Sequence, residues 1–598
     1  MEHKRLDLKA RSLIEAGAEF VSEHLNYLAK MVAIDSRSFG VAEFEGDRKT
    51  PSDMQEILSL AREYLEYIGF TSIKVNQGES GETLPFPLLL AEGPISEAKP
   101  TILFYAHLDK QPYMDDGRFL KWGGVSPTEL KWNHDKSRAY GRGAADDLSG
   151  VISIGMSVHA LIKTLEADGS ANPINELPCN IKIMYETEEE CGSHSLAEQI
   201  KSNPEFFKDI DCVIITDVVN PATGAPGLTA SLRGIIQMDI ELEKVDPDLD
   251  KEPQTSLYKL LATLIRDDHT LAVDEILQAD IPLTTSEMDG LSEVPTTVEA
   301  LREMAGVLPA TSLTVGDDKT SILESQLRKS FVNVRPGHRV TGSVVLGQAG
   351  VRLKFSGTNE FKGIEENLKK IIEEKNTFNL QVLLEKASEN SNEIAFDLVL
   401  TASTKDPHSG VNGGPFPIAE LQIAKMVEYI DAQLGSSTKL IASPLNLSEK
   451  DNRRLFSDPT AKAIVEIRLA PGNFHEDAQA HLKKHLLNHS PDGFRLNIKE
   501  DKGASPWRTE ITDPVFRQIL DSLETGYEKK PCLYGCGGSI PFVPKLMNTL
   551  GPIPPLCLGA YDPEARMHEP GESLSIADLL GCTRSIVNFI TKLDKMHK

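Results

Sequence analysis

The 598-residue sequence contains no apolar run that approaches the roughly 20 residues of a membrane-spanning helix. Its first residues, MEHKRLDLKARSLIEAG, are charged and lack the apolar centre of a secretory signal peptide. Blocks rich in lysine or arginine are also missing, and the net charge is −26. Because so acidic a surface repels phosphate backbones, the sequence argues against nucleic-acid partners, and nothing in it favours a membrane.

Paired cysteines are missing as well. The seven cysteines are odd in number, mostly scattered, and form no CxxC pair. This pattern argues against a disulfide framework and against a structural zinc knuckle. We therefore expect a soluble, cytoplasmic protein.

The remaining composition is that of a globular protein, with 40% hydrophobic and 25% charged residues. The length exceeds one compact core, so two or more folding units are expected. Strand-like apolar runs begin at Thr101 (TILFYAHLD), Asn180 (NIKIMYETEEE) and Asp211 (DCVIITDVV), with helix-like sequence between them. This alternation predicts an α/β layer with a largely parallel sheet. The three runs end in His, Glu or Asp, at the strand ends where such sheets build their sites.

The middle of the chain predicts an α+β unit that occurs twice. The first copy contains, in order, a strand from Ser231, a helix in SLYKLLATLI, strands in ATSLTV and SFVNVRPG, a helix in IEENLKKIIEE and a strand in NLQVLLEKA. The second copy repeats this order with EIAFDLVLTAS, IAELQIAKMVEYI, KLIASPLNL, AIVEIRLAPG, DAQAHLKKHLL and FRLNIKE. Each copy is β-α-β-β-α-β, the order of a split βαβ sandwich. A chance similarity between two stretches of α/β sequence is the alternative.

After about residue 500 the sequence returns to the style of its first part, with GCGGSIP and YDPEARMHEPGE before a final helix. We therefore expect an α/β domain formed by residues 1–227 and 501–598. Residues 228–390 and 391–500 would be the two copies of an inserted, internally duplicated α+β lid. Crossings near 224–227 and 503–504 would be hinges that open the lid for substrate and close it to exclude water.

The strand from Thr101 ends in His107-Leu108-Asp109. As part of a metal site, His107 offers a ring nitrogen and Asp109 can accept the other ring N–H. A lone histidine is otherwise more often an ordinary surface or core residue. In GRGAADDLSG, residues 141–150, glycines permit close approach to a metal and Asp146 follows a turn. Asp146 or Asp147 could instead cap the helix that starts near Leu148.

Three adjacent carboxylates, Glu188 to Glu190, close the strand from Asn180. They repel one another, so either a solvated loop or a metal site accounts for them. In a site with two metals, one glutamate would bind metal while its neighbour moves protons. Asp217 in IITDVV and His568 in ARMHEPGE complete the set. Oxygen and nitrogen ligands without a thiolate favour Zn²⁺, with Mn²⁺ or Co²⁺ as alternatives.

The order of these motifs resembles the metallopeptidase family of carnosinases, cytosolic dipeptidases, aminoacylases and succinyl-diaminopimelate desuccinylases. The resemblance covers most of the chain and is weakest in the first lid copy. HLDKQP, GRGAADD and ETEEECGS are similar to the family's first three metal motifs. The resemblance implies a zinc-peptidase-like α/β domain that binds two divalent metal ions.

By that likeness, the ligands divide into two sets that share Asp146. One metal would be held by His107, Asp146 and Asp217, and the other by Asp146, Glu190 and His568. Asp109 would orient His107. Glu189 would be the general base that takes a proton from the attacking water and passes it to the leaving amine.

The inserted unit resembles the family's lid. KDPHSGVNGG places His408 where the lid histidine polarises the scissile carbonyl, and a metal and an imidazole aimed at one oxyanion make physical sense. AIVEIRLAPG places Arg468 at a substrate-binding position suited to a carboxylate. GCGGSIP, with Gly538 and Ser539, resembles the loop whose N–H groups meet the substrate's carboxyl end. In the plainer interpretation, His408 and the glycines are turn residues and Arg468 is a surface strand residue.

Three features depart from the family's pattern. Leu148 replaces the lysine of the common DDKG motif, and Cys536 stands where dipeptidase-like members often carry glutamate. The lid occurs twice, and only its second copy has the HSG motif. In many members the lid dimerises and its histidine reaches the partner's site. We expect the first copy to replace the partner's lid, so that the protein functions as a monomer.

The resemblance implies metal-dependent hydrolysis of a peptide or amide bond in a small substrate, with a dipeptide that has a free carboxylate favoured. Deacylation of an N-acyl amino acid is the alternative within the same chemistry, and it would not require a free substrate amine. A catalytically inactive binding or scaffold protein on the same fold is the alternative from another class. The presence of all five ligand positions and of Glu189 argues against it.

Overall fold

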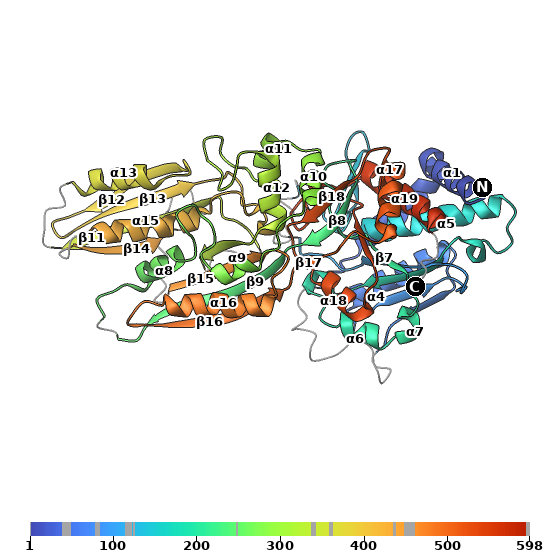
Figure 1. The fold of residues 1–598 in the computed structure, drawn as a ribbon, viewed down its shortest axis with the longest axis horizontal. Coiled ribbons are helices and arrows are strands. Elements are labelled where there is room, and N and C mark those ends of the chain that lie inside the picture. Colours follow the sequence, from blue (N-terminus) through green and yellow to red (C-terminus); the bar gives the residue numbers. More distant parts are fainter. Residues whose placement is uncertain are drawn as a thin grey trace.

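The computed structural model describes residues 2–38, 50–77, 84–113, 122, 126–246, 249–336, 343–357, 363–434, 438–445, 447 and 461–593. They form two parts arranged along the long axis, and both chain ends lie in the same part (Figure 1). That part combines sequence from the two ends of the chain, whereas the other part is built from its middle. The predicted α/β domain with an inserted α+β lid is confirmed. Gly337 and Asn446, which belong to two of the predicted strands, lie outside the described residues.

Among the described residues, nine strands form the central sheet of the α/β part, in the order β1-β2-β6-β3-β7-β19-β8-β17, with β18 also paired to β8. At its centre β3 is parallel to both β6 and β7, as predicted, while the β1, β2 and β17 pairings are antiparallel. The strands are β1 (Ser72–Val75), β2 (Leu89–Glu92), β3 (Thr101–His107), β6 (Asn180–Glu186), β7 (Cys212–Ile215), β8 (Gly227–Leu232), β17 (Trp507–Arg508), β18 (Cys532–Cys536) and β19 (Pro555–Leu558).

Helices cover both faces of this sheet, which is why its central strands are continuous apolar runs. Along β3, Ile102, Phe104 and Ala106 enter one core, whereas Leu103 and Tyr105 enter the other. The first core is closed by α1 (Glu2–Ala16), α2 (Ala18–Ala33), α4 (Ser52–Tyr67), α5 (Leu148–Ala167), α17 (Pro514–Tyr527) and α19 (Ile576–Lys592). The second is closed by α6 (Leu196–Lys201), α7 (Pro204–Phe207) and α18 (Phe542–Leu550).

Of the described helices, α5 alone is long and apolar enough to cross a membrane by length and composition. Its most apolar window is 89% buried inside the protein, against α19, α1 and α2. This degree of burial is that of a central core helix.

A small sheet in the order β20-β5-β4 ties the C-terminal segment to the first part of the chain. Its strands are β4 (Lys131–Trp132), β5 (Arg138–Tyr140) and β20 (Ser573–Ser575). The N–H of Gly141, just after β5, donates to the carbonyl of Glu572, just before β20, at 3.0 Å. The GRGAADD motif therefore begins beside the C-terminal segment.

In the described part of the lid, two four-stranded sheets have the orders β10-β15-β9-β16 and β12-β13-β11-β14. The first copy contributes β9 (Gly234–Lys244), α8 (Pro253–Ala262), β10 (Phe331–Pro336), β11 (Gln348–Gly357), α13 (Ile364–Lys375) and β12 (Gln381–Glu389). The second contributes β13 (Glu393–Thr401), α15 (Ala419–Gln433), β14 (Thr438–Pro444), β15 (Ala461–Leu469), α16 (His475–Asn488) and β16 (Phe494–Ala504). Both copies are thus β-α-β-β-α-β.

The two copies exchange strands, so that each sheet takes two strands from each copy. Figure 1 shows the green strand β9 beside the orange strands β15 and β16. Replacing β9, β10, β11 and β12 by β13, β14, β15 and β16, and the reverse, converts one sheet order into the other. The corresponding helices α8 and α15 pack against each other over one shared core. The duplication therefore has the strand order of a two-fold arrangement within one chain.

Two details of the sequence prediction were wrong. ATSLTV, residues 310–315, forms no strand, because its N–H groups donate to scattered carbonyls, such as that of Ser312 to Phe378 and that of Thr314 to Pro415. The third strand of the first copy is β11, which the sequence analysis missed. The boundary predicted at 390/391 lies in the turn between β12 and β13, within one sheet, so it divides the copies in sequence without separating two bodies in space.

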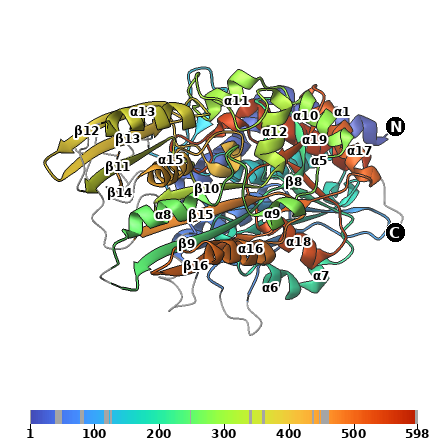
Figure 2. The ribbon, with the colours of Figure 1, turned by 60° about the vertical axis from the view of Figure 1, so that its left-hand side comes forward.

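The chain leaves the central sheet between Leu232 and Gly234 and returns between Ala504 and Trp507, a few residues beyond the predicted crossings. A helical insertion in the first copy, α9 (Asp274–Ala279), α10 (Thr285–Glu293), α11 (Val298–Met304) and α12 (Lys319–Arg328), reaches back to this junction. α10 and α12 pack against β18, and in Figure 2 they lie over the junction of the two parts. The lid is therefore in contact with the α/β part beyond the two crossings.

Candidate active site

Three of the predicted site groups lie at the same edge of the central sheet. His107 is the last residue of β3, Asp217 follows β7 by two residues, and Glu189 and Glu190 lie in the short helix η2 (Glu189–Cys191) after β6. Because β6, β3 and β7 are adjacent and parallel, their carboxyl ends converge. Asp146 joins them from the turn before α5, and His568 from the loop after the short helix η3 (Pro563–Ala565).

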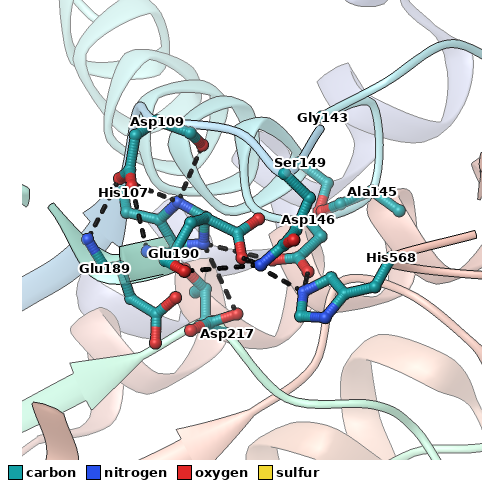
Figure 3. Close-up of polar contacts among 12 residues, drawn as sticks. His107, Asp109, Gly143, Ala145, Asp146, Ser149, Glu189, Glu190, Asp217 and His568 are labelled. Carbon is teal, nitrogen blue, oxygen red and sulfur yellow. Dashed lines mark hydrogen bonds and ion pairs between the residues drawn. The ribbon is translucent and has the colours of Figure 1, made fainter. Parts of the chain in front are cut away.

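Asp146 lies at the centre of the cluster, with its two carboxylate oxygens facing different histidines (Figure 3). Its Oδ1 is 3.1 Å from His107 Nε2, and its Oδ2 is 2.9 Å from His568 Nε2. His568 Nε2 also lies 3.1 Å from Glu190 Oε2, and His107 Nε2 lies 3.8 Å from Asp217 Oδ1. One carboxylate thus connects the two ligand sets that the resemblance implied.

Glu189 lies close to the same groups. Ligand atoms of His107, Glu189 and Asp217 fall within 4.8 Å of one another, as do those of His107, Asp146 and Glu190. The sequence predicted that Glu189 acts as a base and does not bind metal. In the structure its carboxylate lies beside His107 and Asp217, which belong to the first ligand set. Its location suits proton transfer, and Glu189 also belongs to a group of residues that could hold a metal ion.

The charges of this cluster fit two bound cations. Burial raises the pKa of the carboxyls of Glu189, Glu190 and Asp217, whereas contacts with His107 and His568 hold the pKa of Asp146 below its usual range. The buried carboxylates outnumber the two imidazoles, so the protein supplies too little positive charge to balance them. An oxygen and nitrogen donor set without thiolate suits Zn²⁺ or a similar divalent ion. The residues therefore fit a pair of divalent metals.

Asp109 supports the site through two contacts. Its backbone carbonyl lies 3.1 Å from His107 Nδ1, and its carboxylate lies 3.5 Å from the same nitrogen. The carboxylate also accepts hydrogen bonds from the backbone N–H groups of Glu189, at 3.2 Å, and Glu190, at 2.9 Å. The sequence indicated only the contact with His107. The hydrogen bonds from Glu189 and Glu190 fix the turn that carries both glutamates.

Three further residues hold the ligands and are not among the residues predicted from the sequence. Tyr561 donates from its hydroxyl to Asp217 Oδ1 at 3.0 Å, and Gln111 donates from Nε2 to Glu190 Oε2 at 2.7 Å. Glu572 accepts four hydrogen bonds from the GRGAADD segment. All three lie within motifs already singled out, HLDKQP and YDPEARMHEPGE. Only their proximity to a ligand in the sequence could have indicated them.

The lid brings His408 over the cluster. Its ring centroid is 6.4 Å from that of His568, with the ring planes at 88°. Its Nδ1 is buried and has no hydrogen-bond partner among the described residues. Burial and the nearby cations Arg468 and His568 lower the pKa of His408, which favours a neutral imidazole. An unpartnered, neutral ring nitrogen beside the cluster is available to a ligand.

Arg468, on β15, connects three parts of the site and is only 3% exposed. Its Nη1 donates to Ser539 Oγ at 3.1 Å, and its Nη2 donates to Ser409 Oγ at 3.0 Å. Its Nε lies 3.2 Å from Glu466 Oε1. The glycine-rich loop also lies close to the lid, since a Cβ on Gly410 would lie 2.9 Å from Gly538 Cα. The lid is therefore closed, and the structure brings together all the residues predicted from the sequence.

A mixed sheet with parallel central strands, with imidazole and carboxylate ligands at one edge and an α+β lid over them, defines a class of metal-dependent peptidases. Residues 103–592 match the model of Peptidase family M20/M25/M40, and the chain belongs to this family. The resemblance drawn from the motifs is thereby confirmed.

The chain has relatives and structural neighbours that carry more particular names. It is 27% identical to the Cys-Gly metallodipeptidase DUG1 of Candida albicans over 339 residues, 54% of this chain and 64% of that protein. It is 26% identical to the Beta-Ala-His dipeptidase of Mus musculus over 382 residues, 60% of this chain and 73% of that protein. The match thus spans just under two thirds of the Candida protein.

Two solved structures share the fold over nearly the full length. The di-peptidase Dug1p from Saccharomyces cerevisiae aligns with a TM-score of 0.62 at 19% identity, over 99% of this chain and 98% of that one. Human carnosine dipeptidase 1 aligns with a TM-score of 0.63 at 19% identity, over 98% of both chains. The duplicated lid is included in these alignments.

Proposed function

We propose that the chain hydrolyses the amide bond of a dipeptide, or a closely similar small substrate, that has a free carboxylate. The observation that carries this proposal is the position of the Asp146 carboxylate, which directs one oxygen toward His107 and the other toward His568. Support comes from the family and from relatives named as dipeptidases. Within the family's range of small amides, Arg468 and the glycine-rich loop favour a substrate with a carboxylate.

Two divalent ions, with Zn²⁺ favoured, would be held by the sets that share Asp146. One set is His107, Asp146 and Asp217, and the other is Asp146, Glu190 and His568. When bound, such ions polarise a carbonyl and lower the pKa of water. The contributions of the chain's own residues follow from their positions.

Glu189 would move the proton. Its carboxylate is beside His107 and Asp217, and burial raises its pKa, which makes the carboxylate a stronger proton acceptor. Glu189 would take the proton from the attacking water and give it to the nitrogen of the leaving amine. Asp109 accepts a hydrogen bond from the N–H of Glu189 and would thereby hold the backbone of Glu189 in place.

His408 would donate an N–H to the carbonyl oxygen of the scissile bond as negative charge develops there. A neutral imidazole with an unpartnered ring nitrogen can do so without first breaking another hydrogen bond. Arg468 would bind the substrate carboxylate together with Ser539 and the N–H groups near Gly538. A guanidinium fork suits a carboxylate better than an ammonium does.

We further propose that one chain forms the whole site and acts as a monomer. His408 follows β13 and lies beside His568, and Arg468 lies on β15 in the other lid sheet. Arg468 Nη2 nevertheless donates to the hydroxyl of Ser409, the residue after His408, at 3.0 Å. The lid sheet that contains β13 would thus replace the lid that a partner subunit supplies in dimeric members of the family. A size measurement that finds only dimers joined through the lid would contradict this assignment.

The seven cysteines, all within the described residues, are free and form no disulfide. Free buried thiols are compatible with a reducing compartment, which supports a cytoplasmic location.

A matched set of substrates tests the function. The set contains a dipeptide, its N-acetyl form and its C-terminal amide, each assayed with Zn²⁺, Mn²⁺ and Co²⁺. We expect turnover of the dipeptide and a loss of about 100-fold in kcat/KM for the amide, since the Arg468 contact is then missing. Turnover of the N-acetyl form alone would favour deacylation. Metal binding without turnover of any of them would favour the scaffold alternative.

A further inference from the structure

Arg233 lies at the point where the chain passes from the α/β part into the lid, between β8 and β9. Its side chain is fully buried. Among the described residues no carboxylate is paired with it, and every hydrogen-bond acceptor of its guanidinium is a backbone carbonyl. A buried arginine without a counter-ion is costly, so its contacts should have a function.

The guanidinium joins three segments that are far apart in the sequence. Nε donates to Gly537 O at 2.9 Å, in the glycine-rich loop. Nη1 donates to Ser325 O at 3.2 Å, in α12, and to Lys329 O at 3.3 Å. Nη2 donates to the loop that follows His408, with Gly410 O at 2.9 Å and the carbonyls of Ser409 and Gly413 each at 3.4 Å.

These three segments pack closely against one another. A Cβ on Gly537 would lie 2.2 Å from Gly410 O and 2.9 Å from Arg233 Nη2. A Cβ on Gly410 would lie 3.0 Å from the Cε1 atom of His408. The backbone N–H of Arg233 also donates to Cys536 O, at 3.0 Å. A displacement of the guanidinium would therefore displace the loop that carries His408.

We propose that Arg233 is a positioning residue that holds His408 over the metal cluster, by binding the carbonyls of the His408 loop and of the glycine-rich loop at once. This inference rests on the proposed function, in which His408 acts on the scissile carbonyl. An arginine is needed because its planar fork presents five donors in fixed directions, whereas lysine presents a single point charge with three donors. Since the carbonyls come from both parts of the protein, the contact forms only with the lid closed.

A double-mutant cycle tests this inference, with Arg233→Met and Arg233→Lys each made alone and together with His408→Ala. In the presence of His408, we expect each Arg233 variant to lower kcat by about 10- to 100-fold, because misplacement of a catalytic group by about 1 Å has effects of this size. KM should change less, since Arg468 remains. Without His408, the same substitutions should lower kcat less than about threefold, because contacting residues are not additive.

Arg328→Met provides the matched control. Arg328 is another buried lid arginine, on α12, but it pairs with Glu287, and within the described residues it has no hydrogen bond or ion pair to the His408 loop. Its effect on kcat should be the same with and without His408. Metal content and thermal unfolding, measured for every variant, should show the metal sites of the Arg233 variants filled and their fold retained. Arg233→Lys keeps the charge, so the cycle can be completed if Arg233→Met fails to fold.

Two results would overturn the inference in distinguishable ways. If Arg233 substitutions lower kcat equally in both backgrounds, Arg233 does not act through His408, while the proposed function stands. If His408→Ala alone retains full activity, then the function proposed for His408 fails, and the inference about Arg233 fails with it.

Discussion

Glu572 holds the backbone of Asp146, although the two residues are 426 positions apart. Glu572 Oε1 accepts a hydrogen bond from the N–H of Asp146 at 3.0 Å and another from Ala145 at 3.0 Å. Its Oε2 accepts from Gly143 N at 3.1 Å and from Arg142 Nη1 at 2.7 Å. Glu572 is fully buried. The C-terminal segment thus shapes the turn that presents the central carboxylate.

Glu572→Gln is expected to weaken metal binding by about 10- to 100-fold, the range typical of residues that support metal ligands. The amide removes the negative charge and directs an NH₂ group at N–H donors, so the turn should loosen. Competition with a chelator gives the metal affinity of the variant. Glu564→Gln is the matched control, since the Glu564 side chain is 75% exposed and lies on the same segment. Equal affinities for the two variants would show that Glu572 does not support the site.

Asp109→Asn should lower both metal affinity and kcat. The carboxylate accepts the N–H groups of Glu189 and Glu190, and an amide can accept only through its oxygen. One of these buried donors would be left unpaired, and the turn that carries both glutamates would shift. We expect a loss of about 100-fold in kcat/KM, measured with saturating metal. An unchanged kcat/KM would show that the hydrogen bonds from Glu189 and Glu190 to Asp109 are not needed for activity, and that Asp109 acts only through its contact with His107.

Arg468→Lys should change substrate preference more than metal content. Lysine keeps the charge but cannot contact a carboxylate through two parallel N–H groups. For a dipeptide with a free carboxylate we expect KM to rise about 10- to 100-fold. The ratio of kcat/KM for the dipeptide over its C-terminal amide should fall toward one. A ratio equal to that of the unmodified protein would remove Arg468 from carboxylate recognition.

The protein should lose stability between pH 6.5 and about 4 through a buried histidine pair away from the site. His24 Nε2 lies 3.1 Å from His159 Nδ1, and His24 Nδ1 lies 2.7 Å from the hydroxyl of Tyr64. Burial lowers the pKa of His24 to about 3 and that of His159 to about 4. Lys163, Glu166 and Glu23 are the charged groups that act on His159.

The sign follows from proton linkage. Below pH 6.5 the unfolded chain binds protons that the folded pair does not, so the free energy of unfolding falls as the pH falls. Each histidine should contribute about 1.4 kcal/mol per pH unit over this range, and nothing above it. Denaturant unfolding at several pH values measures the slope. The variant His24→Phe with His159→Leu should show a shallower slope, and an unchanged slope would assign the acid sensitivity to other groups.

Part of the cluster was predictable because His107, Glu190 and Asp217 stand at or just after strand ends, where neighbouring parallel strands bring them together. Asp146 and His568 lie in loops away from these strand ends, and the family resemblance implied their place in the site. His107 and Asp217 needed only the strand pattern and the rule for parallel sheets. Glu572 and Tyr561 were not predictable in the same way. Nothing local distinguishes a glutamate that accepts N–H groups 426 positions away from one that is solvated.

The lid shows the same limit. Its β-α-β-β-α-β order could be predicted, but the exchange of strands between copies could not, because strand pairing depends on long-range contacts that leave no local pattern. β11 was missed because charged side chains interrupt QAGVRLKFSG. ATSLTV has the apolar, β-branched composition that predicts a strand, although its N–H groups find acceptors outside any sheet.

The most direct test of the central claim is a comparison of unmodified protein with Glu189→Gln, by metal content and by dipeptide hydrolysis. If Glu189 moves the proton while the other ligands hold two ions, both proteins should contain about two metals per chain. The variant should then lose about 100- to 10,000-fold in kcat, the range typical of a general base. Loss of a metal from the variant would make Glu189 a ligand, as its proximity to His107 and Asp217 allows. Full turnover by Glu189→Gln would contradict the account.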